Sequence, residues 1–189
     1  MKNGVLAAAV VYILWGLLPI YWKALAVVPS SEIMGHRVVW SLPVALALLL
    51  VQGQAGRLRQ MARRPVAWLP SVATAGLLSI NWLTYLWANN NGHIVETSLG
   101  YFINPLVNVL LGLIFLRERL RPGQWGAVAL AAAGVLYLTL SYGQPPWIAL
   151  TLALSFGFYA LIRKTAALGP VEGLTLELSI MFVPTAAYL

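Results

Sequence analysis

The sequence contains no cysteine and no aspartate, and its 189 residues include only five glutamates and two histidines. Without cysteine the chain forms no disulfide and offers no thiolate to a metal ion. Without aspartate it has no Asp-rich diphosphate site, and two widely separated histidines do not form a His-Glu-x-x-His zinc motif. The sequence also has no P-loop, so we expect no ATP hydrolysis by this chain. We therefore expect no metal, no cofactor and no enzymatic activity.

Charge of either sign is scarce. Only 9% of the residues are charged and 60% are hydrophobic, whereas an ordinary soluble domain carries roughly a quarter charged residues. In a bilayer only helices or a closed barrel satisfy every backbone group, and the Leu/Ala/Gly-rich runs lack the alternation of barrel strands. The composition predicts an all-α membrane protein with multi-pass transmembrane helices, with the lipid bilayer as its first partner.

The apolar runs divide the chain into spans that match the roughly 20 residues needed to cross a bilayer. Six complete spans are predicted, and a seventh begins near residue 173. Their predicted bounds, with end points uncertain by about two to four residues, are 4–22, 33–51, 66–89, 95–116, 124–141 and 147–162.

The formal net charge of +7 would suggest nucleic-acid binding in a soluble protein, but the basic residues lie in the linkers between spans. The positive-inside rule places basic linkers in the cytoplasm. It predicts a multi-pass protein of the inner membrane with a cytoplasmic N-terminus and no nucleic-acid partner. Only Lys23 is predicted on the opposite side, while the ten residues predicted on the cytoplasmic side are Lys2, Arg57, Arg59, Arg63, Arg64, Arg117, Arg119, Arg121, Arg163 and Lys164.

An internal similarity is found when the chain is shifted by 141 residues. The shift aligns Gly16 with Gly157, Lys23 with Lys164, Pro29 with Pro170 and Pro43 with Pro184. A repeat of five spans would insert its second copy upside down, as in many secondary transporters. We therefore predict a first five-helix repeat over residues 1–141 and the start of an inverted second repeat over residues 145–189. The chain ends within an apolar run, so we expect that a C-terminal remainder is absent.

Several motifs resemble the RarD-type permease branch of the EamA family, in the drug/metabolite transporter superfamily. They are WGLLPIYWK, EIMGHRVVWSLP, NWLTYLWANN, SLGYFINPLVNVLLG and FLRERLRPGQW, and the resemblance covers nearly the whole chain. It implies a ten-helix protein, made of two inverted five-helix repeats, that moves small molecules across the bacterial cytoplasmic membrane. The present chain matches the first repeat, the sixth helix and the start of the seventh.

The second span carries a polar face that is a candidate substrate-binding site. Glu32, His36 and Trp40 follow each other at intervals of four residues, with Arg37 beside them. An arginine within a membrane is costly unless it is paired, so we expect a substrate or gating role for Arg37. Two alternatives stay open: its long side chain could reach the headgroups as an interfacial anchor, or it could form a structural ion pair with Glu32.

The fourth span presents a polar stripe with spacings of four, three and four residues, formed by Thr97, Tyr101, Asn104 and Asn108. Lipid does not satisfy amide groups, so the stripe must face other helices or a wet cavity. We predict that Tyr101, Asn104 and Asn108 line a substrate path, with hydrogen bonding between helices as the alternative.

The third and first spans supply further candidates for substrate binding. Asn81 and Tyr85 share a face of the third span, and Tyr12 and Trp15 form an aromatic face on the first. Glu96, at the start of the fourth span, is a candidate for proton coupling, although stabilisation by the helix dipole is the simpler interpretation. In the fifth span, Gly126, Ala129, Ala133 and Gly134 predict close helix packing.

We therefore predict a secondary transporter, a permease or exporter that moves small organic molecules or drugs across the bacterial inner membrane by alternating access. Its partners would be the lipid bilayer and a small-molecule substrate. The alternative is a non-transporting membrane partner or assembly subunit, for which association of two copies as a homodimer, or of the chain with a second chain, would be the sign. A membrane-embedded enzyme is the least favoured class.

Overall fold

The computed structural model describes residues 2–54, 56, 60, 65–143, 145–166 and 168–189. All regular secondary structure in those residues is helical, which confirms the predicted all-α membrane fold. The seven helices are α1 (Lys2–Ala24), α2 (Ser30–Val51), α4 (Pro65–Asn90), α5 (Ile94–Phe115), α6 (Pro122–Tyr142), α7 (Trp147–Thr165) and α8 (Pro170–Tyr188).

Five described segments are long and apolar enough to cross a membrane, judged by length and composition. They lie in α1, α2, α5, α6 and α7, and their bounds are Gly4–Ala24, Ser30–Val51, Ile94–Phe115, Pro122–Ser141 and Trp147–Thr165. Helices α4 and α8 are not among the five, although each begins within a few residues of a predicted span. That α4 and α8 also cross the membrane stays a prediction.

The helix ends follow from local residue chemistry. Pro65, Pro122 and Pro170 are the first residues of α4, α6 and α8, where the missing N–H of proline leaves no hydrogen bond unmade. Helix α6 is followed by Gly143, whose φ of 67° lies in the left-handed region that glycine adopts without a steric penalty. These residues set where each helix meets its linker.

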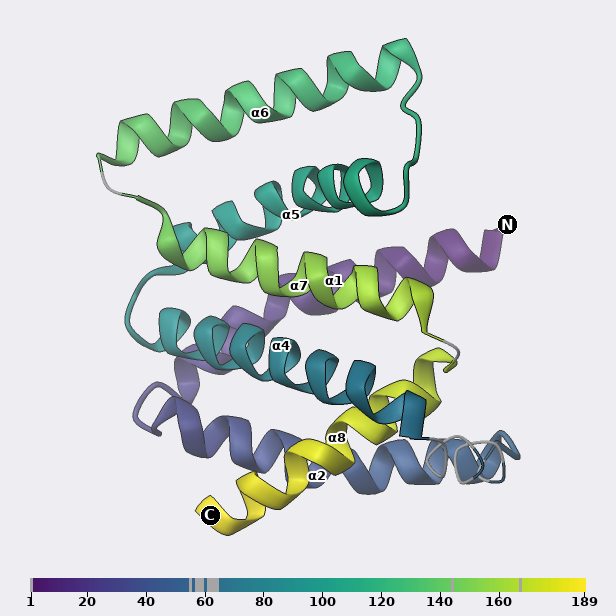
Figure 1. Cartoon of the computed structure of the whole chain (residues 1–189). Coiled ribbons are helices and arrows are strands. Elements are labelled where there is room, and N and C mark those ends of the chain that lie inside the picture. Colours follow the sequence, from purple (N-terminus) through teal and green to yellow (C-terminus); the bar gives the residue numbers. More distant parts are fainter. Residues whose placement is uncertain (1, 55, 57–59, 61–64, 144, 167) are drawn as a thin grey trace.

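Successive helices run in opposite directions, so the linkers alternate between the two ends of the bundle (Figure 1). The N-terminus, the end of α2, and the α5–α6 and α7–α8 connections lie at one end, on the right of the figure. At that end Lys164 Nζ lies 2.5 Å from Glu118 Oε1, an ion pair between the end of α7 and the α5–α6 connection. The predicted basic residues Arg57, Arg59, Arg63 and Arg64 lie outside the described residues.

The described helices pack around three hydrophobic clusters, and the smallest of them, Ala88, Ile148 and Leu152, joins α4 to α7. The largest cluster joins α1, α2, α4 and α8 and contains, among others, Trp22, Val38, Leu86 and Leu178. The second cluster joins α5 and α7 through Leu99, Ile103, Val107, Leu111, Ala149 and Ala153. Helix α6 lies at one edge of the bundle, beyond α5 (Figure 1). The outward faces of α1 and α6 are apolar and exposed, as expected for helices that face lipid.

Small residues bring α5 and α7 into close contact. A Cβ atom on Gly100 would lie 3.2 Å from Leu152 Cβ, and one on Gly157 would lie 2.6 Å from Val107 Cγ1. The close packing predicted for α6 is wrong within this chain, because Gly126, Ala129, Ala133 and Gly134 are all exposed. A Cβ atom added to Gly126 or to Gly134 would meet nothing within 4 Å. Periodicity identified a small-residue face but did not indicate whether a neighbour covers it.

The helix bounds are consistent with the predicted repeat. Helix α1 ends at Ala24 and α7 ends at Thr165, which is 141 residues later. The two helices run in opposite directions, and so do α2 and α8 (Figure 1). Opposite directions are what an inverted second copy requires. The division into repeats over residues 1–141 and 145–189 stays a prediction.

Candidate functional site

The site is built around Arg37, one of the few charged residues within the helices. Its guanidinium carbon lies 4.0 Å from the centroid of the Trp82 ring and 6.0 Å from that of Trp22. Both distances are within the range of a cation–π interaction, which strengthens as the cation loses water. Helices α1 and α4 thus each place a tryptophan against an arginine of α2.

Two tyrosines complete this group of side chains. The rings of Tyr85 on α4 and Tyr101 on α5 meet edge to face, with their centroids 6.2 Å apart. Both tyrosines interact electrostatically with Arg37. We call this set the Arg37 cluster, and its members are Trp22, Arg37, Trp82, Tyr85 and Tyr101. It brings together side chains from four helices, α1, α2, α4 and α5.

A pocket of about 730 Å³ opens beside the Arg37 cluster, between α1, α2 and α8. Three of the predicted substrate-binding residues, His36, Arg37 and Trp40, line it together, and most of its remaining wall is apolar. The full lining is Tyr21, Trp22, Leu25, Val28, Glu32, Ile33, His36, Arg37, Trp40, Ser41, Val44, Ala45, Leu48, Leu174 and Leu178. We call this cavity the Arg37 pocket.

Arg37 retains unused hydrogen-bonding capacity in this pocket. Among the described residues no carboxylate lies within 4.0 Å of its guanidinium, so the Glu32 ion pair considered from the sequence is not formed in this structure. An arginine has five N–H donors in a planar fork that matches a carboxylate or a phosphate. The pocket therefore combines a fixed positive charge, aromatic surfaces and an apolar wall, which together suit an organic anion.

The predicted asparagines have different roles. Asn81 Nδ2 donates to Leu152 O and to Ser155 Oγ, both at 3.0 Å, and thereby connects α4 to α7. This is the hydrogen bonding between helices that was the alternative to a substrate contact. Asn104 differs, because its buried Oδ1 has no hydrogen-bond partner among the described residues. Asn108 is exposed on α5.

The first-span candidates lie outside the Arg37 pocket. Tyr12 and Trp15 are 70% and 50% exposed, and their rings pack against each other with centroids 6.0 Å apart. Trp22, near the end of the same helix, is only 6% exposed and belongs to the Arg37 cluster. Trp82 was missed because it lies off the face that Asn81 and Tyr85 share.

Glu96 is paired at the start of α5. Its Oε1 lies 3.0 Å from His93 Nδ1, and His93 is the residue that precedes the helix. A carboxylate in the first turn is stabilised by the helix dipole, which is the simpler of the two interpretations given for it. Its role in proton coupling stays a prediction.

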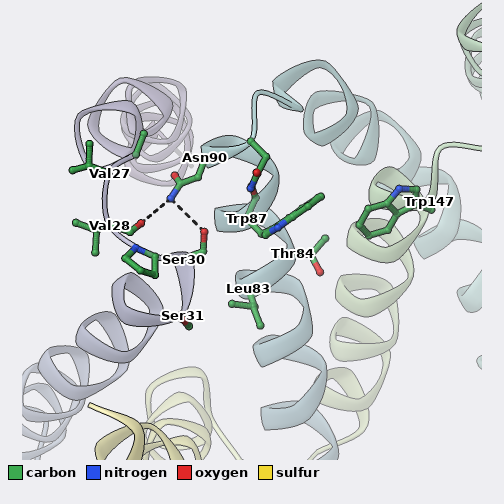
Figure 2. Close-up of a pocket in the computed structure, with 12 residues that line it drawn as sticks. Val27, Val28, Ser30, Ser31, Leu83, Thr84, Trp87, Asn90 and Trp147 are labelled. Atoms are coloured by element: carbon green, nitrogen blue, oxygen red, sulfur yellow. Dashed lines mark hydrogen bonds between the residues drawn. The ribbon is translucent and has the colours of Figure 1, made fainter.

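A second pocket of about 660 Å³ lies where the α1–α2 connection meets the end of α4 and the start of α7. In Figure 2 Asn90 points across to the α1–α2 connection, and its Nδ2 donates to Val28 O at 3.2 Å and to Ser30 Oγ at 3.3 Å. On the other side the rings of Trp87 and Trp147 face each other, with centroids 5.6 Å apart (Figure 2). None of the residues that line this pocket is charged. The Arg37 pocket is therefore the better candidate for a charged ligand.

Comparison with known proteins identifies relatives along the whole chain. The profile of the EamA-like transporter family matches residues 2–140. An uncharacterized transporter of Pseudomonas aeruginosa is 46% identical over 94% of this chain and 59% of its own length. The protein RarD of Salmonella typhi is 46% identical over 98% of this chain and 63% of its own length. An uncharacterized transporter of Vibrio cholerae is 47% identical over 100% of this chain and 62% of its own length.

The chain thus spans about 60% of the length of these curated relatives. No solved structure matches it significantly.

Proposed function

The chain belongs to the EamA-like transporter family, and we propose that it forms the substrate-binding part of a secondary transporter for small organic molecules. The transporter would lie in the bacterial inner membrane and work by alternating access between two inverted repeats. The relatives named as transporters support the general activity. One relative, of Pseudomonas aeruginosa and 36% identical, is named a chloramphenicol-sensitive protein, and we take this name as support for a small organic substrate class.

The observation that carries this proposal is the Arg37 pocket. An ionisable side chain within a membrane is costly and typically marks a substrate or ion path. Here Arg37 is held against Trp82 at 4.0 Å, and no described carboxylate lies within 4.0 Å of its guanidinium, although Glu32 lines the same pocket. A substrate anion would supply the missing charge. Trp40 and Val44 would then contact the apolar part of the same molecule.

Transport itself is tested by counterflow in proteoliposomes that contain the purified protein. Labelled organic anions of different sizes are supplied outside, with the unlabelled compound inside. The proposal expects accumulation of at least one compound above that in protein-free vesicles. Uniform absence of flux, with folded protein confirmed in the vesicles, would remove the transport proposal in favour of a non-transporting membrane partner.

Within this assay Asn104→Ala should lower counterflow. Its buried Oδ1 has no hydrogen-bond partner among the described residues. Asn104 is not one of the residues that line the Arg37 pocket, so this variant tests whether the substrate path extends to it. One hydrogen bond contributes about 1 kcal/mol, so the loss should be roughly fivefold in apparent affinity. Ser98→Ala is the control, since the Ser98 hydroxyl donates to Ile94 O of its own helix. Equal flux in both variants and in the wild type would remove Asn104 from the site.

The proposed orientation is tested by reporter fusions. A tag placed after Gly53 follows α2, and one placed after Gly143 follows α6. With a cytoplasmic N-terminus, alternation of the helices puts the first tag in the cytoplasm and the second in the periplasm. Alkaline phosphatase should be active only at the second position, and green fluorescent protein should be fluorescent only at the first. Phosphatase activity at both positions would contradict the assignment of spans.

A further inference from the structure

Glu177, on α8, is a buried ionisable group that does not line the Arg37 pocket, although Leu174 and Leu178 of the same helix do. It is 1% exposed, although it is a glutamate in the interior of a largely apolar helix. It is the seventh residue after Pro170, so at a rise of about 1.5 Å per residue it lies about 10 Å into the helix. Burial of a carboxylate at such a position is costly unless other groups compensate.

Side chains from two neighbouring helices surround this carboxylate. Tyr159 on α7 donates its hydroxyl to Glu177 Oε2 at 3.3 Å. Arg163, one turn further along α7, places its Nε 3.9 Å from Glu177 Oε1. On the α4 side the hydroxyl of Thr74 lies beside the carboxylate. We call these four residues the Glu177 cluster.

The Glu177 cluster does not fully compensate the cost of burying the carboxylate. Oε1 has no hydrogen-bond partner among the described residues. The separation of 3.9 Å from Arg163 Nε is well beyond the roughly 2.7–2.9 Å of a charge-assisted hydrogen bond. A structural ion pair would be expected to close that gap. The open oxygen leaves a place for a proton.

Arg163 is held in place without Glu177. Its Nη2 donates to Gly169 O at 2.9 Å and to Pro170 O at 3.3 Å, which ties the guanidinium to the α7–α8 connection. It also packs over Gly173, where a Cβ atom would overlap the guanidinium. Arg163 therefore keeps two acceptors when the carboxylate is neutral. The ion pair can break without leaving the arginine unpaired.

Among the described residues, the other helices that pack against α8 place no further charged group beside Glu177. Helix α4 contains no charged residue, and α2 contains none after Arg37. The groups that face Glu177 and bear a proton or a charge are Tyr159 and Arg163 on α7. On α8 itself the nearest is Glu172, which lies in the first turn of the helix and is 2% exposed. Glu96, by contrast, is paired with His93 at a helix start.

We propose that Glu177 is the proton-binding group that couples transport to a proton gradient, with Arg163 as its counter-ion. This inference rests on the proposed transport function. In one half of the cycle the carboxylate takes a proton from water and becomes a neutral carboxylic acid, and its pairing with Arg163 ends. In the other half it returns the proton to water on the opposite side and pairs again. Arg163 and Glu177 both belong to the second predicted repeat, whereas Thr74 belongs to the first, so each event alters the packing of α8 against α4 across the two predicted repeats.

The decisive variant is Glu177→Gln, which keeps the size of the side chain and removes the exchangeable proton. In proteoliposomes, counterflow at equal pH should stay within about twofold of wild type, because exchange needs no net proton movement. Accumulation driven by an imposed pH gradient should fall to the level measured without the gradient. Glu172→Gln is the matched control, a buried glutamate of the same helix, and should keep gradient-driven accumulation. Equal loss in both variants, or unchanged accumulation in Glu177→Gln, would overturn the proposal.

An infrared measurement separates failure of this inference from failure of the transport proposal. Difference spectra of the purified wild-type protein between acidic and alkaline pH should contain the C=O stretch of a protonated carboxyl group. Because all five glutamates contribute to this absorption when protonated, the band of Glu177 is the one component that should be missing from the Glu177→Gln spectrum and present in the Glu172→Gln spectrum. If the band persists in Glu177→Gln, the proton-binding role is wrong whether or not the protein transports. If counterflow is absent but the band is lost as expected, only the transport proposal fails.

Discussion

Replacing Arg37 by alanine is expected to weaken the binding of an anionic substrate by roughly 10- to 150-fold. Hydrogen bonds to charged groups contribute about 1.5–3 kcal/mol, and every 1.4 kcal/mol changes affinity tenfold. We expect the affinity for the anion to decrease, because Arg37 is the cationic residue among those that line the pocket. Trp82 and Trp22 lie against the guanidinium, so a bound anion should change their fluorescence. Titration of tryptophan fluorescence with ligand, checked by calorimetry, measures the dissociation constant.

The variant Arg37→Lys distinguishes a binding role from interfacial anchoring. Lysine keeps the positive charge and a long side chain, but it lacks the planar fork and stacks less well on Trp82. If Arg37 binds the substrate, the affinity of Arg37→Lys should lie between those of wild type and Arg37→Ala. If Arg37 is only an interfacial anchor, Arg37→Lys should have the wild-type affinity. Arg119→Ala, which changes an exposed arginine of the α5–α6 connection, should bind as wild type does. An unchanged dissociation constant in Arg37→Ala would remove this residue from the site.

The sequence was sufficient to predict the fold because a membrane-spanning helix must be apolar over a length set by the bilayer. The predicted span 66–89 and the observed α4, Pro65–Asn90, differ by one residue at each end. The predicted span 33–51 begins later than α2, which starts at Ser30, because polar residues of the first turn hide the helix start. Apolar length and proline positions are properties of a single segment, so they can be read without knowing the neighbouring helices.

The site could be predicted only where its residues share one helix. His36, Arg37 and Trp40 were grouped by spacing on α2, and the structure places all three in one pocket. Trp22 and Trp82 were not assigned to this site, because their contact with Arg37 depends on which helices are neighbours. The partner of Asn81 is Ser155, 74 residues further along the chain, and no periodicity encodes such a pair.

Glu177 was missed for a different reason. The sequence shows it four residues into a seventh span predicted to begin near residue 173, where a charge near an end is ordinary. In the structure α8 begins at Pro170, so the same residue lies two turns inside the helix and is buried. A shift of three residues in a predicted boundary thus changed a terminal charge into an interior one. Arg163 was predicted only to lie in a cytoplasmic linker, because it follows the end of the predicted sixth span.

The largest effect on stability is expected where α5 and α7 approach most closely. An added Cβ on Gly157 would lie 2.6 Å from Val107 Cγ1 and 3.1 Å from Leu111 Cδ1. Overpacking of this kind typically costs about 1–3 kcal/mol, and leucine would intrude further than alanine. Helix association in a membrane depends on such close packing, because lipid tails are as apolar as the side chains.

We therefore expect Gly157→Leu to lower the free energy of unfolding by about 1–3 kcal/mol, measured by denaturant titration of the purified protein in mixed micelles. Gly134→Leu is the matched control, a glycine of α6 where an added Cβ meets nothing within 4 Å, and it should leave stability nearly unchanged. Gly157→Ala should lie between the two, because a single methyl group requires only small shifts of Val107. If Gly157→Leu were as stable as Gly134→Leu, the α5–α7 contact would not be the close one described here.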